Sequence, residues 1–254
     1  MFPYTKAVAH DAGWIWDIPL TTRRGTGLVY SAQHMTDDEA LETFSRYHGK
    51  DLENANVRKI PMNAGYRQKL WEKNCVTLGL AQGFVEPLEA TSLFVTDFCA
   101  GMIAKKIPCN SEEIPLYEKS CNEISALIWE RIFDFIQLHY CISDRRDTSF
   151  WRAVTEQVPL SALLSERLAL WQYAIPQRTD FASTFDFFHT ESYLSVLYGM
   201  DFPTRAPVVG ERLSAFSRDK IATHLEKSKY MAEALMPQRG WLDELKAFAS
   251  KKAM

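Results

Sequence analysis

Residues 111–140 carry the feature that most limits the fold, an apolar stripe that recurs every three or four positions along one long segment. The stripe consists of Cys121, Ile124, Leu127, Ile128, Ile132, Phe135 and Ile136. A face this wide predicts an amphipathic helix whose apolar side is covered by other elements. The fold must therefore contain a helical layer, and we expect this helix at its centre.

The rest of the sequence after residue 91 also has a helical pattern, which proline residues interrupt. Further helices are expected at 91–106, 149–157, 160–174, 184–200, 210–236 and 240–251. These segments follow one another without a low-complexity linker or an internal repeat. The pattern predicts a mostly α-helical module over residues 93–254.

The N-terminal part begins with a predicted strand at 10–20. Trp14 and Trp16 stand on alternating positions there, which gives the strand one aromatic face. Pro19 is expected to end or bend the strand, because proline cannot donate to a strand ladder. A turn at 21–27, with two glycines and two arginines, leads into the next strand.

A helix and another strand follow in this part of the chain. Thr36 and Glu39 have the spacing of a capping box, which predicts a helix at 37–47. Residues 57–62 are predicted as a short strand. Residues 1–92 therefore form a short mixed sheet region, and the whole chain is predicted to be an α+β protein.

The charge and cysteine content exclude several classes of protein. The net charge at pH 7 is −3, so no basic surface directs the chain to nucleic acid or to a membrane. No apolar run approaches the roughly 18 residues of a transmembrane helix. The five cysteines form no CxxC pair, so we expect a cytoplasmic protein with reduced thiols and no metal site.

Residues 83–92, Gly-Phe-Val-Glu-Pro-Leu-Glu-Ala-Thr-Ser, are the strongest candidate for a functional site. A helix that begins near Thr91 would direct free backbone N–H groups and its positive dipole end at this loop, which favours a bound anion. Glu86 and Glu89 lie beside that position, and a carboxylate there can act as a base. The same residues are also compatible with an ordinary helix cap.

A run of small residues precedes this loop. Gly79, Ala81 and Gly83 stand on alternating positions, which allows either a flat ligand or another backbone to come close. No GxGxxG sequence follows a strand, so the phosphate-binding loop of a dinucleotide fold is not in this sequence. GxSxG, HExxH and P-loop motifs are missing as well.

Three motifs, in this order, resemble the flavin-dependent halogenases of the tryptophan halogenase family. Residues 14–19, Trp-Ile-Trp-Asp-Ile-Pro, match their W-x-W-x-I-P signature, which separates them from related flavin monooxygenases. Residues 74–92 resemble a second conserved block of the family. Residues 135–140, Phe-Ile-Gln-Leu-His-Tyr, followed by 144–151, resemble a third. The resemblance covers nearly the whole chain.

The resemblance implies halogenation of an electron-rich aromatic compound such as an indole, with reduced FAD, oxygen, and chloride or bromide. In the family, hypohalous acid formed at the flavin travels to a lysine, which delivers the halogen to the ring. The family's catalytic glutamate matches Glu89, which would stabilise the ring cation and take its proton. Glu86 would be structural. The expected partners are the aromatic substrate, a flavin reductase acting in trans and a second copy in a homodimer.

The resemblance also implies binding roles for other residues of the second block. The backbone N–H groups of Thr91 and Ser92 would bind the halide near the flavin. Ala81 and Gly83 would lie against the cofactor, although tight packing of the chain explains small residues equally well. We carry both interpretations of these small residues forward.

The substrate side shows departures from the enzymes that act on free tryptophan. Phe188 and Tyr193 would contact the substrate, with Phe188 near the position of a tryptophan that sandwiches the indole. Ser183 falls near a carboxylate that binds the free amino acid, so the substrate need not be free tryptophan. Trp14 and Trp16 would crowd the space between flavin and substrate, with core packing as an equal alternative.

The family's GxGxxG loop and essential lysine have no counterpart in this sequence. We therefore expect the chain to correspond to the C-terminal portion of a halogenase, inactive alone and prone to self-association. One alternative is a non-enzymatic binding module, or a half that pairs with a separately encoded flavin half. Another is a fragment of a related flavin monooxygenase, which the tryptophan motif disfavours.

Overall fold

The computed structural model describes residues 4–20, 22–49, 52, 57–205 and 211–252. The chain divides into a larger unit, Ala7–Trp16 with Gly27–Arg205, and a smaller one, Met1–Lys6 with Asp17–Thr26 and Ala206–Met254. Helices predominate over a small amount of sheet, which confirms the predicted α+β class. The boundary expected at residue 92 separates two sequence patterns and stays a prediction.

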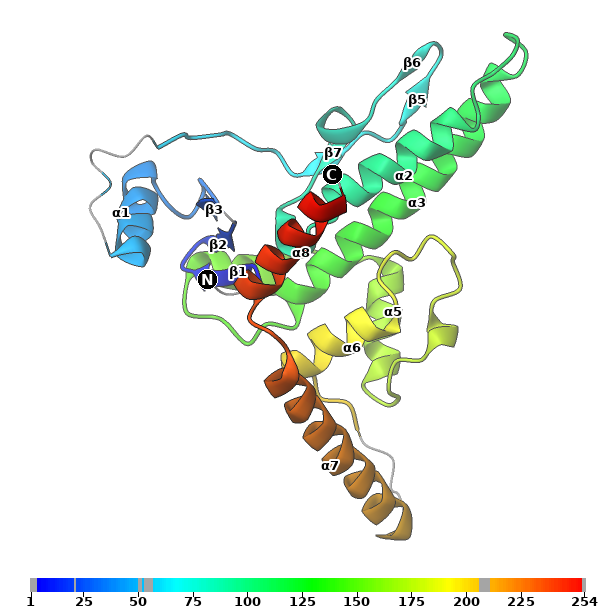
Figure 1. Ribbon diagram of the computed structural model, residues 1–254. Helices are drawn as coiled ribbons and strands as arrows, with labels where there is room; N and C mark the ends of the chain where they lie inside the picture. Colours follow the sequence, from blue (N-terminus) through cyan, green and yellow to red (C-terminus); the bar gives the residue numbers. More distant parts are fainter. Residues whose placement is uncertain (1–3, 21, 50–51, 53–56, 206–210, 253–254) are drawn as a thin grey trace. The chain divides into compact units, whose positions relative to one another are not determined.

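Three strands near the N-terminus form one sheet in the order β1-β2-β3 (Figure 1). They are β1 (Lys6–His10), β2 (Gly13–Pro19) and β3 (Arg24–Tyr30). Gly13 lets β2 approach β3, because a Cβ at that position would lie 2.1 Å from the carbonyl oxygen of Val29. Pro19 ends β2, as its missing N–H predicts.

The turn predicted at 21–27 is shorter in the structure, since β3 already begins at Arg24. The N–H of Leu20 donates to the carbonyl oxygen of Arg23 across this turn, and residue 21 lies outside the described residues. Asp17, which is 1% exposed, accepts two hydrogen bonds from the guanidinium of Arg24. This pair keeps the charge of a buried carboxylate compensated.

The helix α1 (Asp37–His48) begins and ends as its sequence predicts. The hydroxyl of Thr36 accepts from the N–H of Glu39, whose carboxylate accepts from the N–H of Thr36. Gly49 ends the helix in the left-handed conformation, at a φ of 63°. Local capping residues are therefore enough to fix this element.

Four short strands follow α1. They are β4 (Gly65–Tyr66), β5 (Trp71–Glu72), β6 (Cys75–Val76) and β7 (Gly83–Phe84). β4 pairs with β7 and β5 with β6, both in antiparallel register. The strand predicted at 57–62 is wrong: residues 57–64 have no regular structure, since no described strand pairs with them and Pro61 has no N–H to donate.

The larger unit continues with the helices α2 (Ser92–Ala104), α3 (Ile114–Cys141), α4 (Ser149–Arg152), α5 (Ala162–Trp171) and α6 (Thr190–Gly199). Short helical segments lie between them: η1 (Gly79–Ala81), η2 (Pro87–Glu89), the π-helical η3 (Ala153–Gln157) and η4 (Arg178–Asp180). The helix predicted from residue 184 begins only at Thr190. Residues 184–189 are irregular instead, with Asp186 placed 3.6 Å from Arg131 and 3.5 Å from Arg167.

The helix α3 is the centre of the larger unit, as its apolar stripe predicts, and α2 packs alongside it (Figure 1). Ile128, Ile132, Phe135 and Leu138 on α3 are 0% exposed. Burial of such a side chain contributes about 1.5–3 kcal/mol. A second apolar cluster contains Ala12, Met35, Ala40, Phe150 and Trp151. Tyr140, near the end of α3, packs against both clusters.

The smaller unit contains two long helices, α7 (Glu211–Ala234) and α8 (Gln238–Lys252). Both match the segments predicted at 210–236 and 240–251 to within a few residues. None of the helices in the described part of the chain combines the length and the apolar character needed to cross a bilayer.

Candidate functional site

The loop at 83–92 is a tight turn between β7 and α2. Pro87 begins the 3-10 helix η2, which ends at Glu89. Ala90 then adopts the left-handed conformation, at a φ of 53°. A residue other than glycine rarely adopts this conformation, and such strain is concentrated at functional sites. One strained residue, Ala90, therefore lies between Glu89 and Thr91, the N-cap of α2.

Glu89 is held by a histidine from the far end of α3. Its Oε1 lies 2.9 Å from Nε2 of His139, while Nδ1 of that ring lies 2.8 Å from the carbonyl oxygen of Phe135. A carbonyl oxygen can only accept, so Nδ1 carries a hydrogen. The neutral ring then has no hydrogen left for Nε2, and a carboxylate also only accepts. The contact therefore requires one more proton, on Nε2 or on Oε1.

The second carboxylate of the turn has a different partner. The hydroxyl of Tyr140 donates to Oε1 of Glu86 at 2.7 Å, and Nε1 of Trp14 donates to the same hydroxyl at 3.1 Å. Trp14 and Trp16 lie on one face of β2 with ring centroids 6.5 Å apart, and Trp14 also contacts Trp151. The motif tryptophan on β2 is therefore connected to the turn by hydrogen bonds.

The start of α2 is the position at which a halide is predicted to bind. Thr91 is the N-cap, but its side chain does not bond to the first N–H groups of the helix. The carbonyl oxygen of Thr91 accepts from Val95, and that of Ser92 accepts from the hydroxyl of Thr96 at 2.7 Å. The N-terminal N–H groups are thus left without a side-chain cap, which suits an anion.

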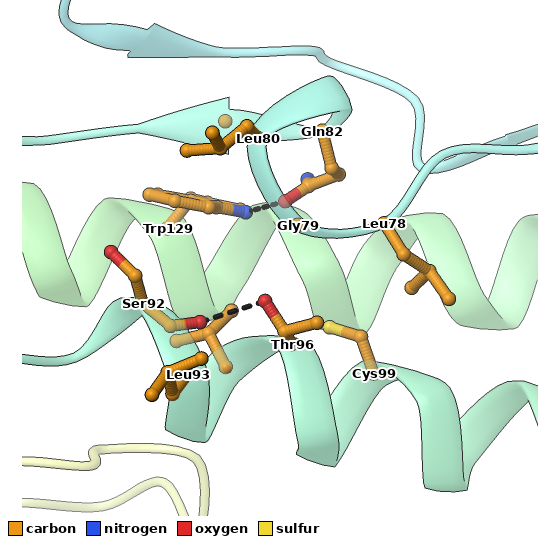
Figure 2. A pocket seen from close by; sticks show the side chains of 11 residues that line it. Leu78, Gly79, Leu80, Gln82, Ser92, Leu93, Thr96, Cys99 and Trp129 are labelled. Carbon is orange, nitrogen blue, oxygen red and sulfur yellow. Dashed lines mark hydrogen bonds between the residues drawn. The ribbon is translucent and has the colours of Figure 1, made fainter.

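A cavity of about 250 Å³ lies between η1 and the first turns of α2 (Figure 2). Its lining consists of Leu78, Gly79, Leu80, Gln82, Gly83, Ser92, Leu93, Val95, Thr96, Cys99 and Trp129. Most of these side chains are apolar. The amide of Gln82 accepts from the indole N–H of Trp129 and donates to Ser125 at 3.0 Å, so it fixes the ring that forms one wall. The cavity is apolar, with one flat aromatic wall and a helix start beside it.

The small residues predicted to bind cofactor have identifiable neighbours. A Cβ at Gly83 would lie 2.7 Å from the Trp129 ring and 2.8 Å from Cβ of Tyr66, so the glycine makes room for protein side chains. Ala81 is exposed, and its carbonyl oxygen accepts from Arg67 at 2.7 Å. The packing interpretation explains Gly83. Binding of cofactor at either residue stays a prediction.

The residues predicted to contact substrate lie next to the partner of Glu89. Phe188 stacks on Phe135, with ring centroids 3.8 Å apart and the planes at 18°. Tyr193 packs against the same ring at 4.8 Å. Phe135 in turn contacts His139 at 5.1 Å. The structure therefore joins Glu89, His139, Phe135 and Phe188 in one continuous cluster, although Phe188 is 9% exposed and Tyr193 1%.

Several residues of this site were not assigned a role from the sequence. His139 and Tyr140 belong to the third family motif, and their adjacency was the available signal. Gln82 and Trp129 gave no signal of their own. Nothing in their spacing shows that a glutamine in the loop meets a tryptophan 47 residues later.

The sequence profile of the tryptophan halogenase family matches residues 1–213, which is most of the chain. The chain belongs to the tryptophan halogenase family. It is 34% identical over 201 residues to tryptophan 6-halogenase SttH of Streptomyces toxytricini. It is 32% identical over 217 residues to tryptophan 7-halogenase RebH of Lentzea aerocolonigenes. These matches cover 78% and 81% of this chain, but 37% and 41% of the two relatives.

Solved structures of tryptophan halogenases and their relatives have the same fold. The tryptophan halogenase of Shewanella frigidimarina NCIMB 400 matches with a TM-score of 0.85 and 34% identity, over 94% of this chain and 46% of that one. BrvH, a flavin-dependent halogenase from Brevundimonas sp. BAL3, matches with a TM-score of 0.82 and 30% identity, over 96% and 49%. This member of the family thus spans about half the length, or less, of the halogenases described here.

Proposed function

We propose that this chain forms the substrate and halide side of a flavin-dependent halogenase, which places a halogen on an electron-rich aromatic ring. Glu89 carries the proposal, because His139 holds one of its oxygens while Thr91, two residues later, is the N-cap of α2 and gives the helix no side-chain cap. A base and an anion site thus lie in one short turn. A carboxylate that served only as a cap would instead bond to the N–H groups of α2.

The cavity beside this turn fits part of a flavin. Its wall at Trp129 is flat and apolar, and Ser92 at the start of α2 also lines it. Groups that would hold a dinucleotide pyrophosphate are not among its lining residues, and the sequence has no GxGxxG. The chain therefore works with a flavin-binding region of the family type, which also supplies the lysine. When bound, reduced FAD with oxygen supplies the oxidising power that makes a halide electrophilic.

The residues of this chain then have separate tasks. The N–H groups of Thr91 and Ser92 hold the halide. Oε2 of Glu89, which has no hydrogen-bond partner among the described residues, accepts the proton that the ring carbon loses. The carbon–halogen bond has formed by then, and the electrons of the broken C–H bond restore the aromatic ring. As a carboxylate, Glu89 also stabilises the ring cation.

The proposed substrate is an indole or phenol-type aromatic compound that need not be free tryptophan. Phe188 supplies an aromatic contact beside Phe135. The hydroxyl of Ser183 accepts from the N–H of Phe185 at 3.0 Å, and this position offers no carboxylate to the ammonium group of an amino acid. A flavin reductase acting in trans supplies the reduced flavin.

The test is a reductase-coupled assay with FAD, bromide, oxygen and either indole or tryptophan, in which mass spectrometry detects brominated product. The chain replaces the corresponding region of SttH, so that SttH supplies the flavin-binding region. Bromoindole as the main product supports the proposal. A strong preference for tryptophan contradicts the substrate class. Bromination of neither compound, while intact SttH halogenates tryptophan, contradicts the proposed function.

A further inference from the structure

Tyr140 occupies a position that packing alone does not explain. It lies near the end of α3, where it contacts both apolar clusters of the larger unit, yet its hydroxyl faces two polar groups. One is the indole N–H of Trp14 on β2, and the other is the carboxylate of Glu86 in the turn. These two residues are 126 and 54 positions away from Tyr140 in the sequence. The hydroxyl is therefore the junction of three separate elements.

Chemistry fixes the direction of both hydrogen bonds. The indole N–H of Trp14 can only donate, so the hydroxyl oxygen of Tyr140 is the acceptor. That hydroxyl then has its own hydrogen free for Glu86, whose carboxylate can only accept. Burial, followed by the charge of Glu86, raises the pKa of Tyr140 well above its ordinary value, so the hydroxyl keeps its hydrogen. Trp14 therefore donates to Tyr140, and Tyr140 donates to the carboxylate of Glu86.

The residue next to Tyr140 holds the other end of the same turn. His139 contacts Glu89 at 2.9 Å, and Tyr140 donates to Glu86 at 2.7 Å. Both carboxylates of the turn, Glu86 before η2 and Glu89 at its end, are therefore attached to adjacent residues of α3. Two contacts fix both the distance of the turn from α3 and its orientation relative to α3. A single contact would leave the orientation free.

We propose that Tyr140 is a positioning residue of the halogenase site, whose hydroxyl connects Trp14 to Glu86 and thereby sets the orientation of the turn that presents Glu89. This inference rests on the proposed function for the role of Glu89. The relay, by which we mean the two hydrogen bonds from Trp14 to Tyr140 and from Tyr140 to Glu86, does not depend on that function. Glu86 becomes an anchor of the turn, and Trp14 acts on the turn through Tyr140 in addition to filling space.

The first test uses the chain itself and the indole N–H resonances of its tryptophans in ¹H–¹⁵N spectra. The Trp14 resonance is assigned by its loss in Trp14→Phe. We expect Tyr140→Phe to shift this resonance, and Glu86→Met to shift it as well, because Glu86 accepts from the hydroxyl to which Trp14 donates. Tyr117→Phe is the matched control, because Tyr117 lies on α3 and its hydroxyl has no hydrogen bond among the described residues. An unmoved Trp14 resonance in Tyr140→Phe overturns the proposal.

The second test measures coupling by urea unfolding. Tyr140→Phe should raise the unfolding equilibrium constant by about tenfold or more, as expected for loss of a hydrogen bond to a charged group. Glu86→Met should have a similar effect in the native background, but less than about threefold in the Tyr140→Phe background, because the shared bond is already missing. If the two substitutions have fully additive effects on the free energy of unfolding, the relay is overturned.

The third test uses the SttH hybrid with bromide and indole. Tyr140→Phe should lower kcat by about tenfold with little change in KM, since a misplaced base weakens the chemical step more than binding. Tyr117→Phe should leave both unchanged. Equal activity of Tyr140→Phe and the parent overturns the positioning role. An inactive parent hybrid contradicts the proposed function, and the two preceding tests then decide on the relay by themselves.

Discussion

His139 and Glu89 are joined by a hydrogen bond between α3 and the turn before α2. Nε2 of the histidine lies 2.9 Å from Oε1 of the glutamate, and the other ring nitrogen is already committed to the carbonyl oxygen of Phe135. Neither group can donate to the other in its neutral histidine and carboxylate forms. The pair is therefore a defined unit, in which one carboxylate oxygen of Glu89 is engaged and the other has no hydrogen bond among the described residues.

The first prediction concerns this pair. His139→Leu should lower the free energy of unfolding by about 1 kcal/mol, because it leaves the carboxylate of Glu89, two-thirds buried, without its donor. His139→Gln should cost less, since its amide N–H can still donate to Glu89. Urea unfolding of both variants checks this. Equal destabilisation by leucine and glutamine would show that the contact does not stabilise the fold.

The second prediction concerns the glycine behind the cavity. Gly83→Ala should lower the free energy of unfolding by about 1–3 kcal/mol, because the new methyl group would meet Trp129 and Tyr66 at less than 3 Å. Gly101→Ala, in the last turn of α2 where the new Cβ would meet no neighbouring side chain within 4 Å, should instead stabilise by about 0.5–1 kcal/mol. Thermal or urea unfolding separates the two. A tolerated Gly83→Ala would contradict the packing role of this glycine.

The third prediction concerns pH. Burial lowers the pKa of His10 below 6.5. The neutral ring is fully bonded, with one nitrogen donating to Val29 at 3.0 Å and the other accepting from Ala12 at 3.2 Å. As pH falls through about 6.5, the unfolded chain takes up a proton before the native one does. Stability should therefore fall by at most about 1.4 kcal/mol per pH unit in that window.

The control for this pH effect is a second histidine. His10→Gln should flatten the dependence of the unfolding free energy on pH just below 6.5, while His224→Gln, on an exposed face of α7, should leave it unchanged. Urea unfolding at several pH values measures both slopes. The same slope with and without His10 would contradict the assignment.

The fourth prediction concerns thiol reactivity. Burial raises the pKa of Cys99 to about 11, whereas Cys75 and Cys109 are exposed. Alkylation of native protein at pH 8 should therefore be at least roughly a hundredfold slower at Cys99, since the thiolate is the reacting form. Mass spectrometry of iodoacetamide-treated peptides gives the rates. In urea the difference should disappear, and fast native labelling of Cys99 would contradict its burial.

Much of the fold was predictable, because its signals are local. The capping box at Thr36 and the stripe on α3 depend on residues a few positions apart, and both elements form as expected. The errors have non-local causes. The residue types at 57–62 favour a strand, but no described strand pairs with them. Residues 184–189 are irregular instead of helical, because Asp186 lies beside arginines on α3 and α5.

The site was predictable to the same extent. The position of Glu89 before a helix that begins near Thr91 follows from the loop's own sequence, and in the structure Thr91 is the N-cap of α2. The partners of the two glutamates do not follow, because His139 and Tyr140 lie 50 and 54 residues further along the chain. Periodicity shows that α3 has an apolar face, but it does not show which end of the helix meets the turn.

The most direct test of the central claim is bromination of indole by the SttH hybrid that carries Glu89→Gln. Glutamine keeps the size of the side chain and removes the base, so kcat should fall by at least about a hundredfold. Glu123→Gln, at an exposed position on α3, should retain the parent's activity and serves as the control. Bromination by Glu89→Gln at the parent's rate would contradict the assignment of Glu89 as the catalytic base.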